Sequence, residues 1–326
     1  MLNSIIDVPG IKVGHAHDEG YNSGCTVILC GPDGAVPGVD SRGGAPGTRE
    51  TDCLQPENVV PITHGIFLSG GSAYGLACGT GIMKYLEEHK VGFNVGPAVV
   101  PIVAGAVLND LAFADSAIRP DEAMGYRACI NASETETRQG NIGAGVGCCI
   151  GRLAGNATGS MKGGLGTASF RVGDLIVGAL VAVNCNGDVR DPDTGKILAG
   201  TLDDRTGRIA GSRSIMSESA GLYREGFPSN TTIGVIATNA AIDKAAARRI
   251  AMIAHDGYAR TIDPVHTLGD GDVIFCLGKG TLPADLNRVG AIAAWTMAQA
   301  VVNAVRNAES LHGIPNWKDI TGASDT

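Results

Sequence analysis

Aromatic side chains are scarce in this chain of 326 residues, in which phenylalanine, tyrosine and tryptophan together make up 4%. Hydrophobic residues nevertheless account for 44% of the sequence, so the core is expected to be aliphatic and rich in alanine, with closely approaching layers. The 48 glycines are interleaved with runs of valine, isoleucine and alanine, and they show no repeat period. This pattern indicates turns and close packing rather than disorder.

Excess positive charge is also lacking, because the formal net charge is -8 and no basic patch interrupts the acidic balance. This argues against nucleic acid or an anionic membrane as a partner. The chain has no uninterrupted span of about 18 apolar residues, so a transmembrane helix is not expected. The opening residues lack a basic region followed by a long apolar core, which is the mark of a signal peptide. We therefore expect a cytoplasmic protein.

Cysteine pairs with metal-binding or redox spacing are absent from the sequence. The nine cysteines fall mostly within apolar segments, and none forms a C-x-x-C pair. We interpret them as reduced core residues in a cytosol. The histidines, including His15, His17 and His266, have no cluster of metal-ligating neighbours along the chain. No metal and no other cofactor is expected.

Strand and helix patterns alternate along the chain in the order that a layered α/β fold requires. Expected strands span residues 26–29, 175–183, 232–238 and 273–277, and expected helices span residues 73–88, 243–258 and 291–307. Asp243 is a suitable N-cap for the second helix. Residues 188–226, rich in Asp, Arg, Gly and Ser, are expected to form a long exposed loop. The length fits one large or two small domains, and we favour one domain over residues 1–326.

Asn230-Thr231-Thr232 stands directly before the apolar run 233–237, and Asp270-Gly271-Asp272 follows further along the chain. A hydroxyl residue at a loop-to-strand junction, with acidic residues returning downstream, suits a protein that cuts its own backbone. The Thr231 hydroxyl would attack the carbonyl of Asn230, and hydrolysis of the resulting ester would expose Thr231 as a new N-terminus. Its freed α-amine, with a pKa near roughly 8, could then serve as the base that activates its hydroxyl.

The residues by themselves leave ordinary alternatives open. Asn230-Thr231 is also a common loop end before a strand. Asp270-Gly271-Asp272 could form a tight turn or a weak divalent-metal site. Asn184, at the end of the apolar run 175–183, could simply cap a strand before the Asn186-Gly187 turn.

Several ordered blocks of sequence resemble one known family. The blocks are VDSRGGAPGTRETD at 39–52, LSGGSAYGL at 68–76, GAGVG at 143–147, MKGGLGTAS at 161–169, NTT at 230–232 and HTLGDGD at 266–272. They resemble the DmpA family of L-aminopeptidase/D-esterases, which includes β-aminopeptidases and the nylon-oligomer endo-hydrolase. The resemblance covers most of the chain. It implies a four-layer αββα sandwich of the N-terminal-nucleophile type, self-cleaved here into residues 1–230 and 231–326.

The resemblance also implies roles for individual residues. It places the cut between Asn230 and Thr231 and makes Thr231 the nucleophile. Asp270 and Asp272 match the pair that orients the nucleophile and its amine in the nylon hydrolase. Asn184 matches an asparagine whose amide donates to the developing oxyanion, a contact typically worth roughly 3 kcal/mol of transition-state stabilisation.

Two departures from the family pattern affect these roles. Members with aminopeptidase specificity commonly carry glycine-serine at the cut, whereas this chain has asparagine-threonine, as the nylon hydrolase does. Where that hydrolase has a catalytic lysine, this chain has Arg152, and Lys162 in the next block is an alternative source of the ammonium. Tyr74 is a candidate lining residue of the substrate pocket.

We therefore expect a self-processing N-terminal-threonine amidohydrolase or aminopeptidase that cleaves small peptides or peptide-like oligomers, with 6-aminohexanoate oligomers as a side activity. One alternative function is an acyltransferase of the ornithine acetyltransferase type. It would use the same threonine nucleophile but transfer the acyl group to an acceptor such as ornithine in place of water. The other alternative is a non-catalytic ligand-binding protein, whose chain would remain uncleaved. The family's habit favours a homo-oligomer, with a tetramer as one form.

Overall fold

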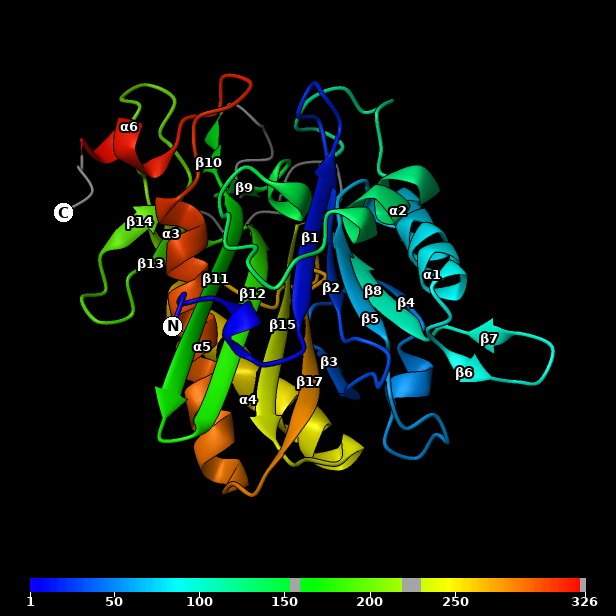
Figure 1. Cartoon of the computed structure of the whole chain (residues 1–326). Helices are drawn as coiled ribbons and strands as arrows, with labels where there is room; N and C mark the ends of the chain where they lie inside the picture. Colours follow the sequence, from blue (N-terminus) through cyan, green and yellow to red (C-terminus); the bar gives the residue numbers. More distant parts are fainter. Residues whose placement is uncertain (153–158, 219–229, 323–326) are drawn as a thin grey trace.

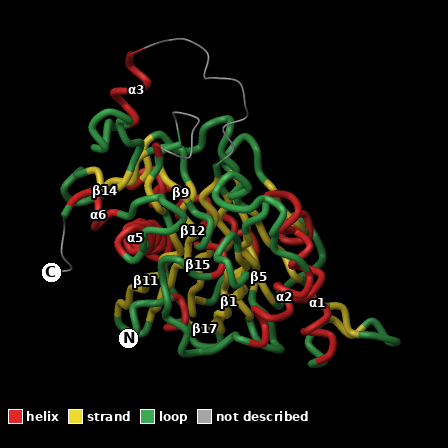
Figure 2. Tube along the Cα trace, turned by 90° about the horizontal axis from the view of Figure 1, so that it is seen from above, coloured by secondary structure: helices red, strands yellow, loops and turns green. Residues whose placement is uncertain are grey.

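The computed structural model describes residues 1–152, 159–218 and 230–322. Two five-stranded sheets pack face to face, and a pair of helices covers the outer face of each sheet (Figure 1). Viewed from above, α5 lies on one side of the molecule and α1 with α2 on the other, with the sheets between them (Figure 2). The architecture is the expected four-layer αββα sandwich.

The first sheet has the strand order β1-β2-β5-β8-β4, and only β5 and β8 are parallel neighbours. Its strands are β1 (Lys12–His17), β2 (Gly24–Leu29), β4 (Gly47–Arg49), β5 (Gly65–Ser69) and β8 (Val103–Val107). Helices α1 (Cys78–Glu88) and α2 (Glu122–Ile130) cover its outer face. A Cβ on Gly81 would lie 1.8 Å from the Glu122 carbonyl oxygen, so the missing side chain lets the two helices touch.

The second sheet has the order β11-β12-β15-β17-β3, in which only β15 and β17 are parallel. Its strands are β3 (Val36–Ser41), β11 (Gly164–Val172), β12 (Leu175–Asn184), β15 (Thr231–Ala240) and β17 (Val273–Leu282). Helices α4 (Lys244–Thr261) and α5 (Leu286–Arg306) cover it. Asp243 caps α4 as expected, because its carboxylate accepts the Ala246 N–H at 2.8 Å.

The central strand β15 shows how the layers divide its side chains. Ile233, Val235 and Ala237 face the other sheet, whereas Ile236 and Ala240 face the helices. The core between the sheets is aliphatic, and Phe275 is its only aromatic member among the described residues. The cysteines also follow expectation, since all nine are free and all except Cys53 are buried.

Shorter elements connect the layers. They are η1 (Ile5–Asp7), η2 (Asp52–Leu54), η3 (Ser72–Ala77), η4 (Gly143–Gly145), β6 (Phe93–Asn94), β7 (Val99–Val100), β9 (Cys149–Ile150), β10 (Met161–Lys162), β13 (Asp188–Arg190), β14 (Ile197–Ala199), β16 (Ile262–Asp263), α3 (Ser212–Glu218) and α6 (Trp317–Thr321). The expected helix over 73–88 therefore begins as the 3-10 turn η3 and continues as α1. No helix in the described ranges is long and apolar enough to cross a membrane.

The expectation of a long loop over residues 188–226 is wrong for its described part. β13 pairs with both β14 and β16, and α3 follows. Two tight turns explain the polar composition: Asp191 accepts the N–H of Thr194 at 3.0 Å, and Asp203 accepts the N–H of Thr206 at 2.8 Å. The polar residues thus close turns within folded structure. The rest of the predicted loop, at 219–226, lies outside the described residues.

Candidate active site

Thr231 is the first residue of β15, and its neighbour across the ladder is Asn184, the last residue of β12. The Thr231 side chain is buried, with 4% of the residue exposed. Its Oγ1 donates to the carbonyl oxygen of Asn230 at 2.6 Å. The hydroxyl predicted to be the nucleophile therefore lies against the peptide group that the sequence predicts to be cut.

The same carbonyl has a second donor on it. The backbone N–H of Gly271 donates to the Asn230 oxygen at 2.9 Å, within a parallel bridge between Asn230 and Asp270. A Cβ on Gly271 would lie 2.9 Å from Thr231 Oγ1 and 2.7 Å from the Ala45 oxygen, so a glycine is needed here. Backbone donors on a carbonyl oxygen stabilise the negative charge that develops when the carbonyl is attacked. The sequence pattern predicts no separate role for Gly271 within Asp270-Gly271-Asp272.

Asp270 is held by donors on both of its oxygens. One oxygen accepts the Thr267 N–H at 2.9 Å and its hydroxyl at 2.7 Å, and the other accepts the Asn186 side-chain amide at 2.9 Å. Burial, together with the negative charge of Asp272, raises the pKa of Asp270 to about 6. Asp270 therefore changes charge close to neutral pH.

Asp272 connects β17 to the beginning of β15. One carboxylate oxygen accepts the Thr232 N–H at 2.7 Å, and the other accepts the backbone N–H and the ring Nδ1–H of His266, at 3.1 Å and 2.8 Å. The tight turn that the sequence suggested for Asp270-Gly271-Asp272 instead spans residues 267–270. The Asp270 N–H closes it by donating to the Thr267 oxygen at 3.1 Å. Asp270 therefore closes this turn and pairs with Asn230 in a bridge, whereas Asp272 lies beyond the turn and holds the Thr232 N–H.

Asn184 lies at the strand end that the sequence predicted for it. It ends β12, and its buried side chain accepts the Cys149 N–H at 2.9 Å while donating to the Asn109 oxygen at 3.1 Å. These bonds fix which way the amide points. The Asn109 contact accounts for one of the two hydrogens on the amide nitrogen. A second donor hydrogen is thus carried on a rigid group opposite Thr231.

The two candidate cations have different surroundings. The Arg152 guanidinium donates to the Asn230 side-chain oxygen at 3.3 Å, which places it at the predicted cut. The ammonium of Lys162 is fully buried and donates to the carbonyl oxygens of Gly145, Cys148 and Gly163 at 3.0, 3.0 and 2.8 Å. Burial lowers the pKa of Lys162. In the described residues, no hydrogen bond joins either cation to Thr231.

Tyr74 lies on η3, just beyond the end of β5. It is 61% exposed, and the guanidinium of Arg119 lies 4.0 Å from its ring centre. Within the described part of the chain, its ring contact is with Arg119, and no hydrogen bond or ring contact joins it to Thr231. The structure therefore brings together Asn184, Asn230, Thr231, Asp270, Asp272 and Arg152, and leaves Tyr74 and Lys162 outside this set of contacts.

Sequence reasoning missed several polar residues around this set. Asn186, Thr267 and His266 hold the two carboxylates. Asp110, which follows the strand β8, is buried and accepts the Ser23 hydroxyl and the Gly71 N–H, both at 2.6 Å. Burial raises its pKa. The polar pair 109–110 directly after an apolar strand was the signal that could have found it.

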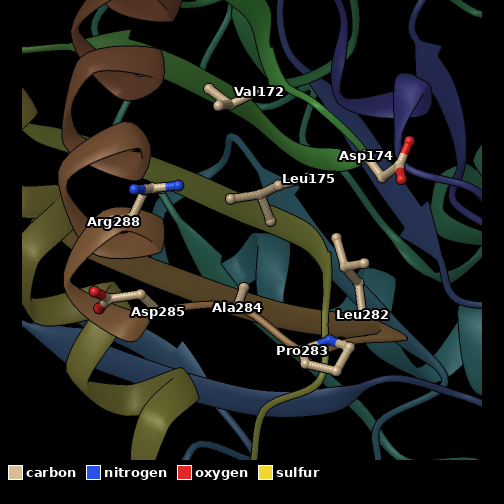
Figure 3. A pocket seen from close by; sticks show the side chains of 8 residues that line it. All are labelled: Val172, Asp174, Leu175, Leu282, Pro283, Ala284, Asp285 and Arg288. Atoms are coloured by element: carbon tan, nitrogen blue, oxygen red, sulfur yellow. The ribbon is translucent and has the colours of Figure 1, made fainter.

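The structure also contains a surface hollow of about 280 Å³ (Figure 3). Its lining residues are Val172, Asp174, Leu175, Leu282, Pro283, Ala284, Asp285 and Arg288. Leu175 begins β12 and Asn184 ends it, so at about 3.3 Å per residue its 10 residues separate the hollow from the nucleophile by roughly 30 Å. The hollow is not part of the candidate active site.

Comparison with known proteins gives consistent results across nearly the whole chain. Residues 3–318 match the model of peptidase family S58. A Mycobacterium bovis protein named as an uncharacterized aminopeptidase is 43% identical, covering 98% of each chain. The 6-aminohexanoate-oligomer endohydrolase of a Kocuria species is 32% identical, over 92% of this chain and 85% of its own.

Solved structures resemble this one in fold. A β-aminopeptidase from a Burkholderia species has a TM-score of 0.71 at 20% identity, covering 98% of this chain and 91% of its own. The L-aminopeptidase D-Ala-esterase/amidase of Ochrobactrum anthropi, described as a variant of the N-terminal-nucleophile hydrolase fold, has the same score and identity over 96% and 88%.

Proposed function

We propose, since the chain belongs to peptidase family S58 and is a hydrolase acting on amide bonds, that it cuts its own backbone between Asn230 and Thr231 and then uses Thr231 as its nucleophile. The fragments would be residues 1–230 and 231–326 of one hydrolase domain. The observation that carries the proposal is the Asn230 carbonyl, whose oxygen accepts the Thr231 hydroxyl at 2.6 Å and the Gly271 N–H at 2.9 Å.

The self-processing step follows from this arrangement. Thr231 Oγ1 attacks the Asn230 carbonyl carbon, and the Gly271 N–H stabilises the oxyanion. The bond from that carbon to the Thr231 nitrogen breaks as the nitrogen takes up the proton that the hydroxyl loses, which leaves an ester between Asn230 and Oγ1. Water hydrolyses the ester, giving a carboxylate on Asn230 and restoring the Thr231 hydroxyl beside a free α-amine.

Substrate hydrolysis repeats the same chemistry on another amide. The α-amine of Thr231 takes the hydroxyl proton as Oγ1 attacks the substrate carbonyl, and it returns the proton to the leaving amine. The acyl group stays on Oγ1 as an ester until water, activated by the same amine, releases it. Departure of Asn230 frees the Gly271 N–H, which can then stabilise the substrate oxyanion together with the Asn184 amide.

The remaining polar residues have supporting roles in this proposal. Asp270 and Asp272 hold the start of β15 and favour the protonated state of the amine after it accepts the hydroxyl proton. Arg152, through its contact with Asn230, is better placed than Lys162 to act on the reacting carbonyl. The three carbonyl oxygens around Lys162 suit a cation that holds together the wall formed by β9, β10 and η4.

Small peptides or peptide-like oligomers are the substrate class that the relatives support. The asparagine-threonine junction, which the nylon hydrolase shares, favours linear amides such as 6-aminohexanoate oligomers as a side activity. We also propose a cytoplasmic homo-oligomer. Sedimentation of the purified protein tests the oligomeric part, and a monomeric mass would contradict it.

Intact-protein mass spectrometry of the native chain beside Thr231→Ala and Thr231→Ser variants tests the central proposal. The native chain is expected to give fragments of roughly 23 and 10 kDa from its 33.2 kDa, the serine variant the same fragments more slowly, and the alanine variant none. Hydrolysis of an amino-acid p-nitroanilide should parallel cleavage. A native chain that stays intact would remove the free amine and favour the binding-protein alternative. Transfer of the acyl group to ornithine in place of water would favour the acyltransferase.

A further inference from the structure

We propose that His266 is a positioning residue for the nucleophile, acting through Asp272 and the Thr232 N–H. This inference rests on the proposed function, because it assigns how the start of β15 is held for the reaction. His266 donates twice to one oxygen of Asp272, from its backbone N–H at 3.1 Å and its ring Nδ1–H at 2.8 Å. The other oxygen of Asp272 accepts the Thr232 N–H at 2.7 Å.

The backbone of His266 supports this role. Its φ angle is +58°, in the left-handed region that residues with a side chain rarely adopt. Such a conformation persists only where surrounding contacts stabilise it, and these places are often functional. Here the left-handed turn lets the backbone and the ring of one residue converge on the same carboxylate oxygen.

The contact between the His266 ring and Asp272 is largely shielded from water. A nitrogen that faces a carboxylate carries the proton, so Nδ1 donates to Asp272. The His266 and Asp272 side chains are 18% and 2% exposed. Asp272 therefore depends on protein donors, rather than on water, to stabilise its charge.

Helix α4 adds the other groups that face the ring. His255 packs edge-on to His266 with ring centres 4.8 Å apart, and Tyr258 lies 6.3 Å away. Burial lowers the pKa of His255 to about 4, so this ring is neutral near pH 7. His255 Nε2 in turn lies 3.6 Å from a carboxylate oxygen of Asp40, which is paired with Arg42. None of these groups donates a hydrogen bond to Asp272. Among the described residues, the His266 ring is the only side-chain donor to that carboxylate.

Three substitutions separate the donor from the backbone strain. Asparagine in His266→Asn places an amide N–H near the position of Nδ1 and tolerates the left-handed conformation, so near-native behaviour is expected. His266→Gly relieves the strain but removes the donor, and His266→Ala removes the donor and keeps the strain. Both should reduce kcat by about 10- to 100-fold with KM changed less than about threefold. His312→Gly is the matched control, because His312 is also left-handed, with φ +51°, and its ring contacts backbone oxygens at the surface.

The readouts are the rate of self-processing, kcat and KM on the p-nitroanilide, and hydrogen exchange of the peptide containing the Thr232 N–H. Exchange is measured in the intact Thr231→Ala background, so it does not depend on cleavage. Faster exchange and slower processing in His266→Gly, with rescue in His266→Asn, support the positioning role. A His266→Gly enzyme with native kcat and native exchange overturns it while leaving the proposed function standing. A native chain that never cleaves would contradict the proposed function but not the role of His266. In that case the hydrogen-exchange measurement alone decides whether His266 holds Asp272 and Thr232.

Discussion

The two ends of the β12–β15 strand pair belong to the same backbone ladder, but their polar side chains are buried at one end and exposed at the other. At one end Asn184 faces Thr231, and polar side chains are buried with protein partners. At the other end Leu175 and Arg288 line a surface hollow (Figure 3), and its charged residues, Asp174, Asp285 and Arg288, are exposed. A surface hollow is therefore a poor guide to the chemistry of this molecule.

Burial explains the difference. A buried polar group is costly unless it has a hydrogen-bond partner, so a cluster of buried carboxylates and amides must be organised by the fold. Asp270 and Asp272 are each held by three protein donors, from Asn186, Thr267, His266 and Thr232. The charged residues at the hollow need no such partners. Fixed geometry, which a reaction requires, is concentrated at the Thr231 end.

The sharpest way to test the comparison is Asn184→Ala, which removes the rigid amide opposite Thr231. We expect kcat to fall by about 100- to 1,000-fold while KM changes little, because the lost donor acts mainly in the transition state. Steady-state kinetics on the p-nitroanilide measures this, and circular dichroism checks the fold. An Asn184→Ala enzyme within threefold of native kcat would show that the amide only caps the strand.

A second test uses Asp270→Asn, which should slow self-processing and raise the stability of the folded chain. The pKa of Asp270 is raised from 3.8 to about 6, so its contribution to stability is complete below the unfolded value and is lost as pH rises through about 6. The full shift corresponds to about 3 kcal/mol. The asparagine variant avoids this loss. It is expected to be more stable than the parent by about 1–3 kcal/mol at pH 8 and equal to it near pH 3, below the unfolded value.

Neighbouring groups can accommodate that change. A donating amide at position 270 would meet the Asn186 side chain, whose oxygen is buried without a partner among the described residues and could accept after a flip of the amide. Urea unfolding of intact chains in the Thr231→Ala background measures the stability, and processing in the native background measures the loss of function. A stability difference that does not vary with pH would contradict the assigned charge behaviour.

The smallest expected effects come from the same substitution made at the two ends. Arg152→Ala removes the guanidinium beside Asn230 and should slow self-processing by about tenfold, because a charged hydrogen bond of this length is a modest contributor. Arg288→Ala, at the exposed hollow, should leave processing and kcat within about twofold of native. Time courses by mass spectrometry compare the two. Equal losses in both variants would remove the distinction between the two ends.

The elements that the sequence predicted share a local cause. The strands over 175–183, 232–238 and 273–277 and the helices over 243–258 and 291–307 were found because apolar periodicity is written into adjacent residues. The Asp243 cap was found for the same reason. The loop assigned to 188–226 was wrong in its described part, since Asp-rich turns within a small sheet have the composition of a loop. His266 and Gly271 were missed because a histidine or glycine beside an aspartate has many ordinary uses.

By itself the sequence determined the layered α/β pattern, the aliphatic core and the position of a threonine at the start of a strand, since each depends on residues close together in the chain. Only the tertiary structure decided that Asn184 faces Thr231, that the Gly271 N–H lies on the Asn230 carbonyl, and that Arg152, and not Lys162, touches the junction. Those contacts join segments far apart in sequence. Strand register and burial fix them, and the sequence near each residue shows which bonds it can make but not with which partner.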